Sequence, residues 1–258
     1  MNVLLRSTSL ILGVTLAAAV AACGGGGESA PAGTAAPAAT VVSNPVDPAT
    51  AGSITGSVKL DGKPPAAGTI NLSSDDYCEK QGPKTTRAFV VDGEGLQNVF
   101  VYVKDGLGNL KFPVPTTPVV LDQKGCWYEP RVFGVQVGQP FNVVNSDDTL
   151  HNVHALPMNN REFNRGQRVK GEKYTTVFTT PEVMVPFKCD VHRWMNAWVG
   201  VLPHPFYAVS GAGGSFELKG LPPGTYTVEA WHEKLGIQTQ TVTIGAKESK
   251  PITFRFKV

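Results

Sequence analysis

Alternation of apolar and polar side chains, interrupted at short intervals by glycine and proline, most constrains the fold of this chain. Such alternation is typical of β-strands that bury one face. Alternating runs occur near residue 55, near residue 100 and at the C-terminus, with apolar positions at Ile54, Val58 and Leu60; at Val99, Val101 and Val103; and at Ile252, Phe254, Phe256 and Val258.

Turn signals separate these runs. The chain has 28 Gly and 20 Pro in 258 residues, too many for long helices. DGKPP at 61–65, KDGLGN at 104–109, GAGG at 211–214 and LPPG at 221–224 have the composition of tight turns. The sequence therefore predicts an all-β protein built of antiparallel β-sandwiches.

The N-terminus has the pattern of a secretory signal peptide. Arg6 precedes an apolar run to Ala22, with no acidic residue before Cys23. The segment VAAC at 20–23 resembles the bacterial lipobox, in which the cysteine after the cleavage site is lipid-modified. We expect residues 1–22 to be removed and Cys23 to carry the lipid; an ordinary secreted protein with an unmodified Cys23 is the alternative.

Residues 23–52 consist mostly of Gly, Ala, Pro, Ser and Thr, a composition that predicts a flexible tether. The whole chain has 23 basic and 21 acidic side chains, and residues 1–22 contain only Arg6 of these. A charge balance this close to neutral gives no support for nucleic-acid binding.

The segment FKCDVHRWM at 187–195 places three soft or borderline metal donors at equal spacing. Cys189, His192 and Met195 follow one another at intervals of three residues, on a short loop between two predicted strands. A thiolate, an imidazole and a thioether suit copper better than magnesium or calcium. Taken singly, Met195 would be a core methionine and His192 a surface histidine; their joint spacing favours a metal site.

A second imidazole comes from YEPRVFGVQVGQPFNVVNSDDTLHNVHA at 128–155, in which a strand ending at Asn145 is followed by His151-Asn152-Val153. This order, together with the C-x-x-H-x-x-M loop, resembles the cupredoxins, and the loop length is similar to that of amicyanin. The resemblance implies one type 1 copper held by His151, Cys189 and His192 with Met195 as a weak axial ligand. It also implies that Asn152 braces the ligand loop.

Residues beside the proposed ligands also have predicted roles. His154 lies an odd number of positions from His151 and should face the other way on an extended strand; it is the alternative ligand. As a hypothesis, His192 is the exposed ligand through which electrons leave. Arg193 and Trp194 would then form part of a docking rim for the partner.

Two further segments resemble carboxypeptidase regulatory-like domains, which are small Ig-like or transthyretin-like β-sandwiches. They are GSITGSVKLDGKPPAAGTI at 52–70 and GSFELKGLPPGTYTVEAWHEKLG at 214–236. The fold expected is a cupredoxin Greek-key β-sandwich, residues 111–206, inserted into an outer sandwich formed by residues 53–110 plus 207–258. Insertion at a surface loop is well tolerated.

The cysteines fit this scheme. If Cys23 carries lipid and Cys189 binds metal, Cys78 and Cys126 remain, and thiols of exported proteins tend to be oxidised. We infer a candidate disulfide between them by subtraction, although the sequence does not show that they lie within bonding distance.

We therefore expect an exported, lipid-anchored type 1 copper protein that carries single electrons. Its partner would be a cytochrome or a periplasmic oxidoreductase. It would face the periplasm or the cell exterior, on the outer membrane if the cell has two membranes. The ligand loop has no second Cys, the chain has no C-x-x-C-H motif and only five His, so we expect no enzymatic activity. The alternatives are a copper-delivery lipoprotein and a structural or adhesive sandwich without metal.

Overall fold

A computed structural model describes residues 43–258. The predicted signal peptide, the predicted lipid attachment site Cys23 and most of the predicted tether lie outside the described residues. Within the described part, no helix is long and apolar enough to cross a membrane. Val46, in the last part of the predicted tether, packs against a hydrophobic core, so the folded unit begins slightly before the first strand.

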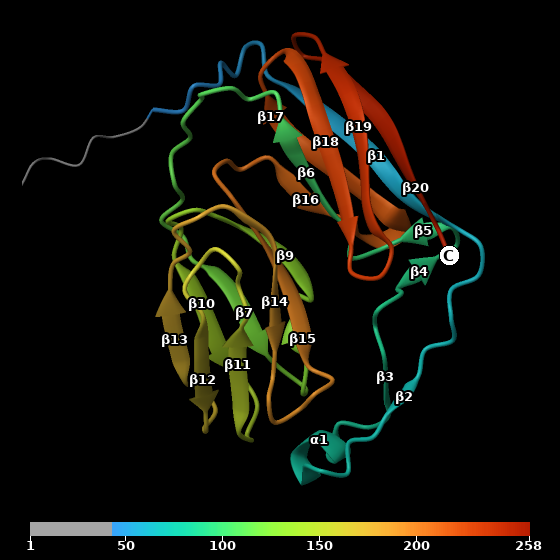
Figure 1. The fold of residues 1–258 in the computed structure, drawn as a ribbon, viewed down its shortest axis with the longest axis vertical. Coiled ribbons are helices and arrows are strands. Elements are labelled where there is room, and N and C mark those ends of the chain that lie inside the picture. Colours follow the sequence, from blue (N-terminus) through green and yellow to red (C-terminus); the bar gives the residue numbers. More distant parts are fainter. Residues whose placement is uncertain (1–42) are drawn as a thin grey trace, which may run out of the picture. The chain divides into compact units, whose positions relative to one another are not determined.

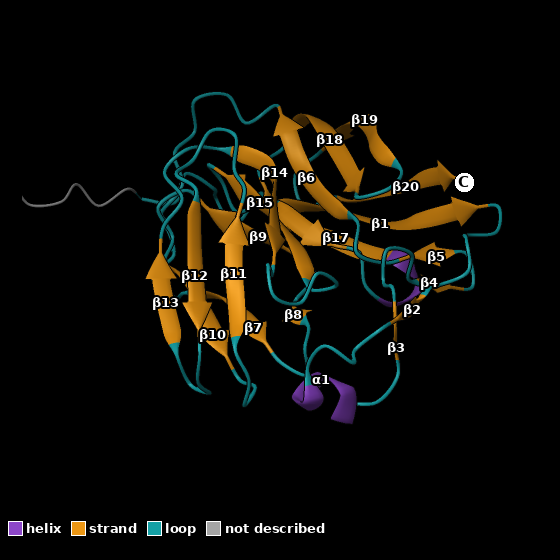
Figure 2. Ribbon diagram, turned by 60° about the horizontal axis from the view of Figure 1, so that its bottom comes forward, coloured by secondary structure: helices purple, strands orange, loops and turns teal. Residues whose placement is uncertain are grey.

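The described chain is almost entirely β-structure, as Figures 1 and 2 show. Its strands form two β-sandwiches, one of which interrupts the other along the chain. This confirms the predicted fold class. The residue boundaries of the two domains remain a prediction.

The outer sandwich is formed by strands from both ends of the described chain. One sheet has the order β17-β1-β5-β4, with β20 also pairing β1, and the other has the order β16-β6-β18-β19. β1 runs parallel to β20 and antiparallel to β17. The bounds are β1 Gly52–Asp61, β4 Val91–Asp92, β5 Gly95–Leu96, β6 Phe100–Asp105, β16 Tyr207–Val209, β17 Ser215–Leu221, β18 Gly224–His232, β19 Gly236–Ile244 and β20 Ser249–Lys257, with a 3-10 turn at Ala212–Gly214.

The inner sandwich is formed by the strands between β6 and β16. Its sheets have the orders β13-β10-β7-β8 and β12-β11-β14-β15-β9. The pairs β7–β10 and β9–β15 are parallel. The bounds are β7 Val119–Gln123, β8 Tyr128–Glu129, β9 Val132–Gln136, β10 Phe141–Asn145, β11 His151–Ala155, β12 Phe163–Gln167, β13 Lys173–Thr176, β14 Glu182–Lys188 and β15 Asn196–Leu202.

Each sandwich has its own hydrophobic core. The alternating residues of β1, β6 and β20 fill the outer one, as their period-two pattern predicts. In the inner core, Phe141 packs against Phe133, Phe178 and Phe187 with ring centroids 5.7 to 5.8 Å apart. Burial of such rings is the main stabilising contribution to a sandwich of this size. Cys189 and Met195 belong to this same inner core.

Two glycines allow the sandwiches to pack closely. A Cβ atom at Gly134 on β9 would lie 2.2 Å from the Tyr207 ring, and one at Gly200 on β15 would lie 2.3 Å from the Phe100 ring. Because real Cβ atoms do not approach so closely, only glycine fits at either position. Tyr207 and Phe100 stack on each other, with ring centroids 5.6 Å apart, and so seal the contact between the sandwiches.

A long excursion of the outer sandwich, between β1 and β4, reaches the inner one (Figure 1). It contains β2 (Thr69–Ile70), helix α1 (Asp76–Lys80) and β3 (Lys84–Thr85). The Asp75 side chain caps α1 by accepting a hydrogen bond from the backbone N–H of Cys78 at 2.9 Å. Cys78 and Cys126 are joined by a disulfide, which attaches this excursion to the segment between β7 and β8.

Candidate metal centre

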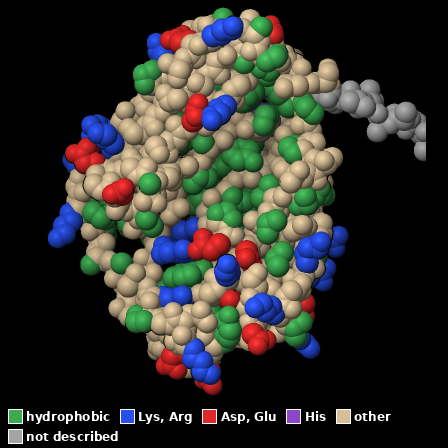
Figure 3. Space-filling view, turned by 180° about the vertical axis from the view of Figure 1, so that it is seen from behind, with side chains coloured by type: hydrophobic (Ala, Val, Ile, Leu, Met, Phe, Trp, Pro, Cys, Tyr) green, Lys and Arg blue, Asp and Glu red, His purple; other side chains and the backbone are tan. Residues whose placement is uncertain are grey.

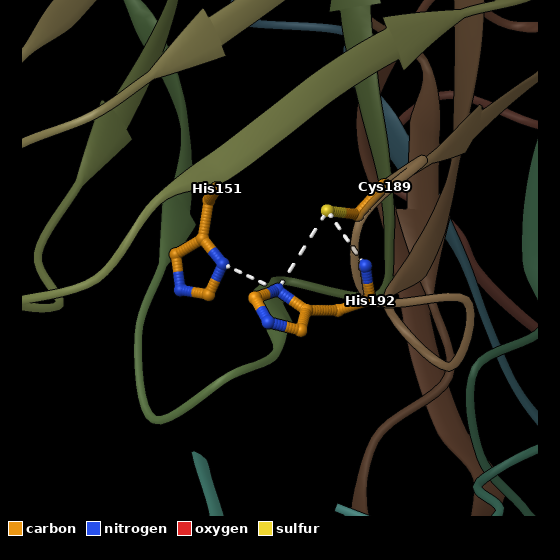
Figure 4. Close-up of side chains that lie close together, drawn as sticks. All are labelled: His151, Cys189 and His192. Atoms are coloured by element: carbon orange, nitrogen blue, oxygen red, sulfur yellow. Dashed lines mark hydrogen bonds between the residues drawn. The ribbon is translucent and has the colours of Figure 1, made fainter. Parts of the chain in front are cut away.

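His151, Cys189 and His192 meet at one end of the inner sandwich. His151 is the first residue of β11, and Cys189 directly follows β14. The Nδ1 atoms of the two imidazoles are 3.0 Å apart, and the Cys189 sulfur lies 3.9 Å from Nδ1 of His192. Figure 4 shows both rings directing a nitrogen toward the same space that the sulfur faces. All three side chains are essentially inaccessible to solvent.

The ligand loop is closed by its own backbone. The N–H of Cys189 donates to the carbonyl of Met195 at 3.0 Å, and the N–H of Met195 donates to the carbonyl of His192 at 2.8 Å. The N–H of His192 in turn donates to the Cys189 sulfur at 3.3 Å. These bonds explain the three-residue spacing, because the loop is one tight turn between β14 and β15. Met195 is fully buried at its end.

Carboxylates hold the outer nitrogens of both imidazoles. Nε2 of His151 lies 2.8 Å from the Asp147 carboxylate, and Nε2 of His192 lies 3.2 Å from that of Asp75. When each Nε2–H donates to its carboxylate, Nδ1 is left with a lone pair that can bind a metal ion beside Cys189. Carboxylates of this kind orient histidine ligands and raise their basicity in metal proteins.

The charges of the site favour a thiolate. Burial alone would raise the pKa of the Cys189 thiol, but hydrogen bonds from His151, His192 and nearby backbone N–H groups lower it to about 6. Burial would likewise raise the pKa of Asp147, yet bonds from His151 and from the N–H groups of Cys126 and Gly125 lower it to about 2. Both groups are therefore anionic at neutral pH, and the thiolate is the form that binds metal.

The donor set fits a metal ion of the copper or zinc size. The ligand atoms of His151, Cys189 and His192 all lie within 4.8 Å of one another. Metal–nitrogen bonds of about 2.0 to 2.1 Å and metal–sulfur bonds of about 2.3 Å place donors roughly 3 to 4 Å apart. The separations of 3.0 Å between the two imidazoles and 3.9 Å between Cys189 and His192 match this spacing. A rigid two-imidazole, one-thiolate set with a nearby methionine is the donor combination of trigonal copper sites.

The remaining predicted residues occupy definite places around this cluster. The Oδ1 atom of Asn152 accepts the backbone N–H of Asp190 at 2.8 Å, so Asn152 contacts the ligand loop. His154 turns away and lies 2.9 Å from Asp190 and 2.8 Å from Glu162, and thus is not among the converging donors. Arg193 is exposed and Trp194 is half-buried.

The hypothesis that His192 is an exposed ligand is wrong, because the His192 side chain has no solvent exposure. The excursion carrying α1 covers it. The Asp75 carboxylate and the Cys78 sulfur lie 3.2 and 3.7 Å from Nε2 of His192. The excursion therefore supplies the residues that contact this edge of the ring.

Sequence reasoning missed Asp75 and Asp147. Asp147 lies four residues before His151, and Asp75 lies three residues before Cys78. Each shares a potential donor cluster with a cysteine of the disulfide: Asp75 with Cys78 and His192, and Asp147 with Cys126 and His151. While the disulfide stands, neither sulfur is a thiolate ligand. Knowing that the Cys78–Cys126 bond lies beside the site would have drawn attention to both carboxylates.

Comparisons with known proteins give partial similarities. No protein-family model matches the sequence, and no curated protein matches it significantly. Among solved structures, the Cu(I) form of an amicyanin variant is 26% identical, with a TM-score of 0.30, over 34% of this chain and 85% of that one. A purple cupredoxin from Nitrosopumilus maritimus is 20% identical, with a TM-score of 0.28, over 33% and 98%.

A Cu-containing nitrite reductase from Thermus scotoductus SA-01 is 21% identical, with a TM-score of 0.32, over 39% of this chain. The similar region spans only 26% of that enzyme. This finding corrects the expectation that the chain is not an enzyme. A structure similar to this chain is, by its name, an enzyme, and the exclusion of enzymatic activity from the sequence therefore does not stand.

Proposed function

We propose that this protein is a type 1 copper protein that carries single electrons. The observation that supports the proposal most is the convergence of His151 Nδ1, His192 Nδ1 and the Cys189 sulfur in one buried cluster. A bound copper ion would supply a one-electron couple between Cu(I) and Cu(II). Met195, at the end of the ligand loop, is the proposed axial ligand.

The protein's contribution is to hold the donors in place. Backbone bonds close the ligand loop, Asp147 and Asp75 fix the two rings, and burial excludes water. Ligands that do not move when the metal changes oxidation state lower the reorganisation that accompanies electron transfer. Such a site suits an electron carrier better than a protein that must release its metal.

The proposed location follows from the N-terminal sequence. Cys23 would carry the lipid and residues 24–52 would link the folded part to the membrane, facing the periplasm or the exterior. The proposed partner is a redox protein such as a cytochrome. The Cys78–Cys126 disulfide is compatible with an oxidising compartment.

Redox cycling with metal retention tests the proposed function. The protein loaded with one equivalent of Cu(II) is reduced with ascorbate, reoxidised with hexacyanoferrate(III), and passed over a desalting column after each step. An electron carrier keeps one copper per chain through repeated cycles. The reduced protein is also mixed with a Cu(I) chelator, and transfer of the copper to the chelator would instead indicate copper delivery.

A further inference from the structure

The excursion around α1 closes the direct path to the metal ligands. Besides the Asp75 and Cys78 contacts to His192, Asp75 accepts a hydrogen bond from Thr149 at 2.7 Å, and the Tyr77 hydroxyl donates to Asp147 at 3.1 Å. The disulfide fixes the same segment covalently. A partner protein therefore cannot contact the His192 ring unless this segment moves.

Trp194 offers another route from the site to the surface. Its ring centroid lies 5.1 Å from that of His192, and its Nε1–H donates to the carbonyl of Cys126 at 3.1 Å. It is half-buried, and it lines a cavity of about 370 Å³ together with Trp127. One side of Trp194 thus contacts a proposed ligand while the ring also borders an open pocket.

The pocket carries an excess of positive charge. Its lining includes four basic side chains, Arg87, Arg131, Arg193 and Lys234, and one acidic side chain, Glu233. Arg131 and Glu233 form a buried ion pair at 2.6 Å, and Arg87 pairs with Glu129 at 2.5 Å just outside the lining. Within residues 43–258, neither Arg193 nor Lys234 forms an ion pair, and both are exposed.

Two basic side chains lie over the Trp127 ring of the pocket. The Arg87 guanidinium lies 4.1 Å from the Trp127 ring centroid, and the Lys84 ammonium lies 5.4 Å from it. Figure 3 shows basic, acidic and hydrophobic side chains meeting around a hollow on one face of the molecule. A pocket lined by two tryptophans and bordered by cations is complementary to an acidic protein surface.

We infer that the redox partner docks at this tryptophan pocket, defined by Trp127, Trp194, Arg193 and Lys234, through an acidic surface patch. The inference rests on the proposed function and deepens it. Carboxylates of the partner pair with Arg193 and Lys234, and Trp194 lies between the partner and His192. The transfer moves one electron and no proton, so one protein is oxidised as the other is reduced.

Charge reversal tests this assignment. The variant Arg193→Glu/Lys234→Glu is compared with Lys63→Glu/Lys257→Glu, which changes two exposed lysines of the outer sandwich and has the same net charge. The second-order rate constant for oxidation of the Cu(I) protein by hexacyanoferrate(III) falls at least tenfold further in the pocket variant than in the control. With hexaammineruthenium(III), a cation, the pocket variant is not slowed. Equal slowing of both variants overturns the inference.

A copper-free measurement gives an independent readout. Iodide quenches the tryptophan fluorescence of the metal-free wild-type protein more than caesium does, and this preference is lost in the pocket variant but kept in the control. In the copper-loaded protein, a glutamate hexapeptide competes with hexacyanoferrate(III) for the pocket and lowers the rate at which this oxidant oxidises the wild-type Cu(I) protein. If the peptide does not compete, the pocket binds small anions only and the protein-docking inference is wrong.

Two controls separate the possible failures. Absence of a thiolate-to-copper absorption band in the folded protein rejects the proposed function, whereas a normal band with equal slowing of both variants rejects only the docking site. If the wild-type protein elutes as a dimer on gel filtration and the pocket variant as a monomer, the occupant is a second copy of this chain, which overturns the assignment to a redox partner.

Discussion

The Asp75 carboxylate lies 3.2 Å from Nε2 of His192, although the two residues are 117 positions apart and come from different sandwiches. The outer sandwich therefore contributes directly to the proposed metal centre of the inner one. Because α1 also covers the His192 ring, the same excursion both orients a ligand and shields it.

Removing the charge of Asp75 weakens metal binding. In Asp75→Asn the cap of α1 is preserved, since Asn and Asp cap helices equally well, but the imidazole of His192 loses its anionic partner. We expect copper affinity to fall about 10- to 100-fold, as measured by competition with a chelator. Asp76→Asn, which alters the exposed neighbouring carboxylate, serves as the matched control and leaves the affinity unchanged.

Removing the disulfide loosens the cover. The bond closes a loop with a sequence separation of 48, for which chain entropy predicts a stabilisation of about 4 kcal/mol. In Cys78→Ala/Cys126→Ala we expect the free energy of unfolding, measured with denaturant, to fall by this amount. Relative to the wild-type protein, the rate of amide hydrogen exchange should increase more in residues 71–82 than in β10 and β11. A uniform increase of exchange across the inner sandwich would contradict the view of a locally attached segment.

Adding a methyl group at Gly200 disturbs the packing between the sandwiches. The Phe100 ring would lie 2.3 Å from the new Cβ, so the ring must shift. We expect Gly200→Ala to lower the free energy of unfolding by about 1 to 3 kcal/mol. In the control Gly166→Ala the atom nearest to the new Cβ is Leu150 Cδ1 at 3.9 Å, so the free energy of unfolding should fall much less. Equal decreases in the two variants would contradict the close-approach explanation.

Acid destabilises the protein through two buried histidines outside the metal centre. Burial lowers the pKa of His204 and of His232 to about 4, from an ordinary value of 6.5. The folded protein thus binds fewer protons than the unfolded chain between these values, so stability is kept above pH 6.5 and lost as the pH falls toward 4, by roughly 3 kcal/mol per histidine. Urea unfolding of the metal-free protein at several pH values measures this, and His204→Gln/His232→Gln should flatten the dependence.

The strands and the ligand loop could be predicted because their signals are local, whereas His151 was assigned through the resemblance of His151-Asn152-Val153 to the cupredoxins. Alternation identified β1, β6 and β20, and the three-residue spacing of Cys189, His192 and Met195 placed them on one turn. The environment of His192 could not be predicted in this way. Its burial depends on α1, more than a hundred residues earlier, and no local pattern shows that an excursion of one sandwich reaches the end of the other.

The same limit applies to the two carboxylates and to the pocket beside Trp194. Asp147 stands in an ordinary SDD turn, and only the fold brings it to His151. Arg193 and Trp194 were predicted at a docking rim around an exposed His192. In the structure both line a pocket that also includes residues 70 and 86–88 of the excursion, 127, 131 and 196 of the inner sandwich, and 233–234 of the outer sandwich.

The visible absorption spectrum of the protein with one equivalent of Cu(II), measured beside Cys189→Ser, tests the central claim most directly. An intense thiolate-to-copper band that ascorbate bleaches, and that is absent from Cys189→Ser, is the predicted result. If the folded wild-type protein shows no such band and has the same spectrum as Cys189→Ser, then His151, Cys189 and His192 do not form a type 1 copper site.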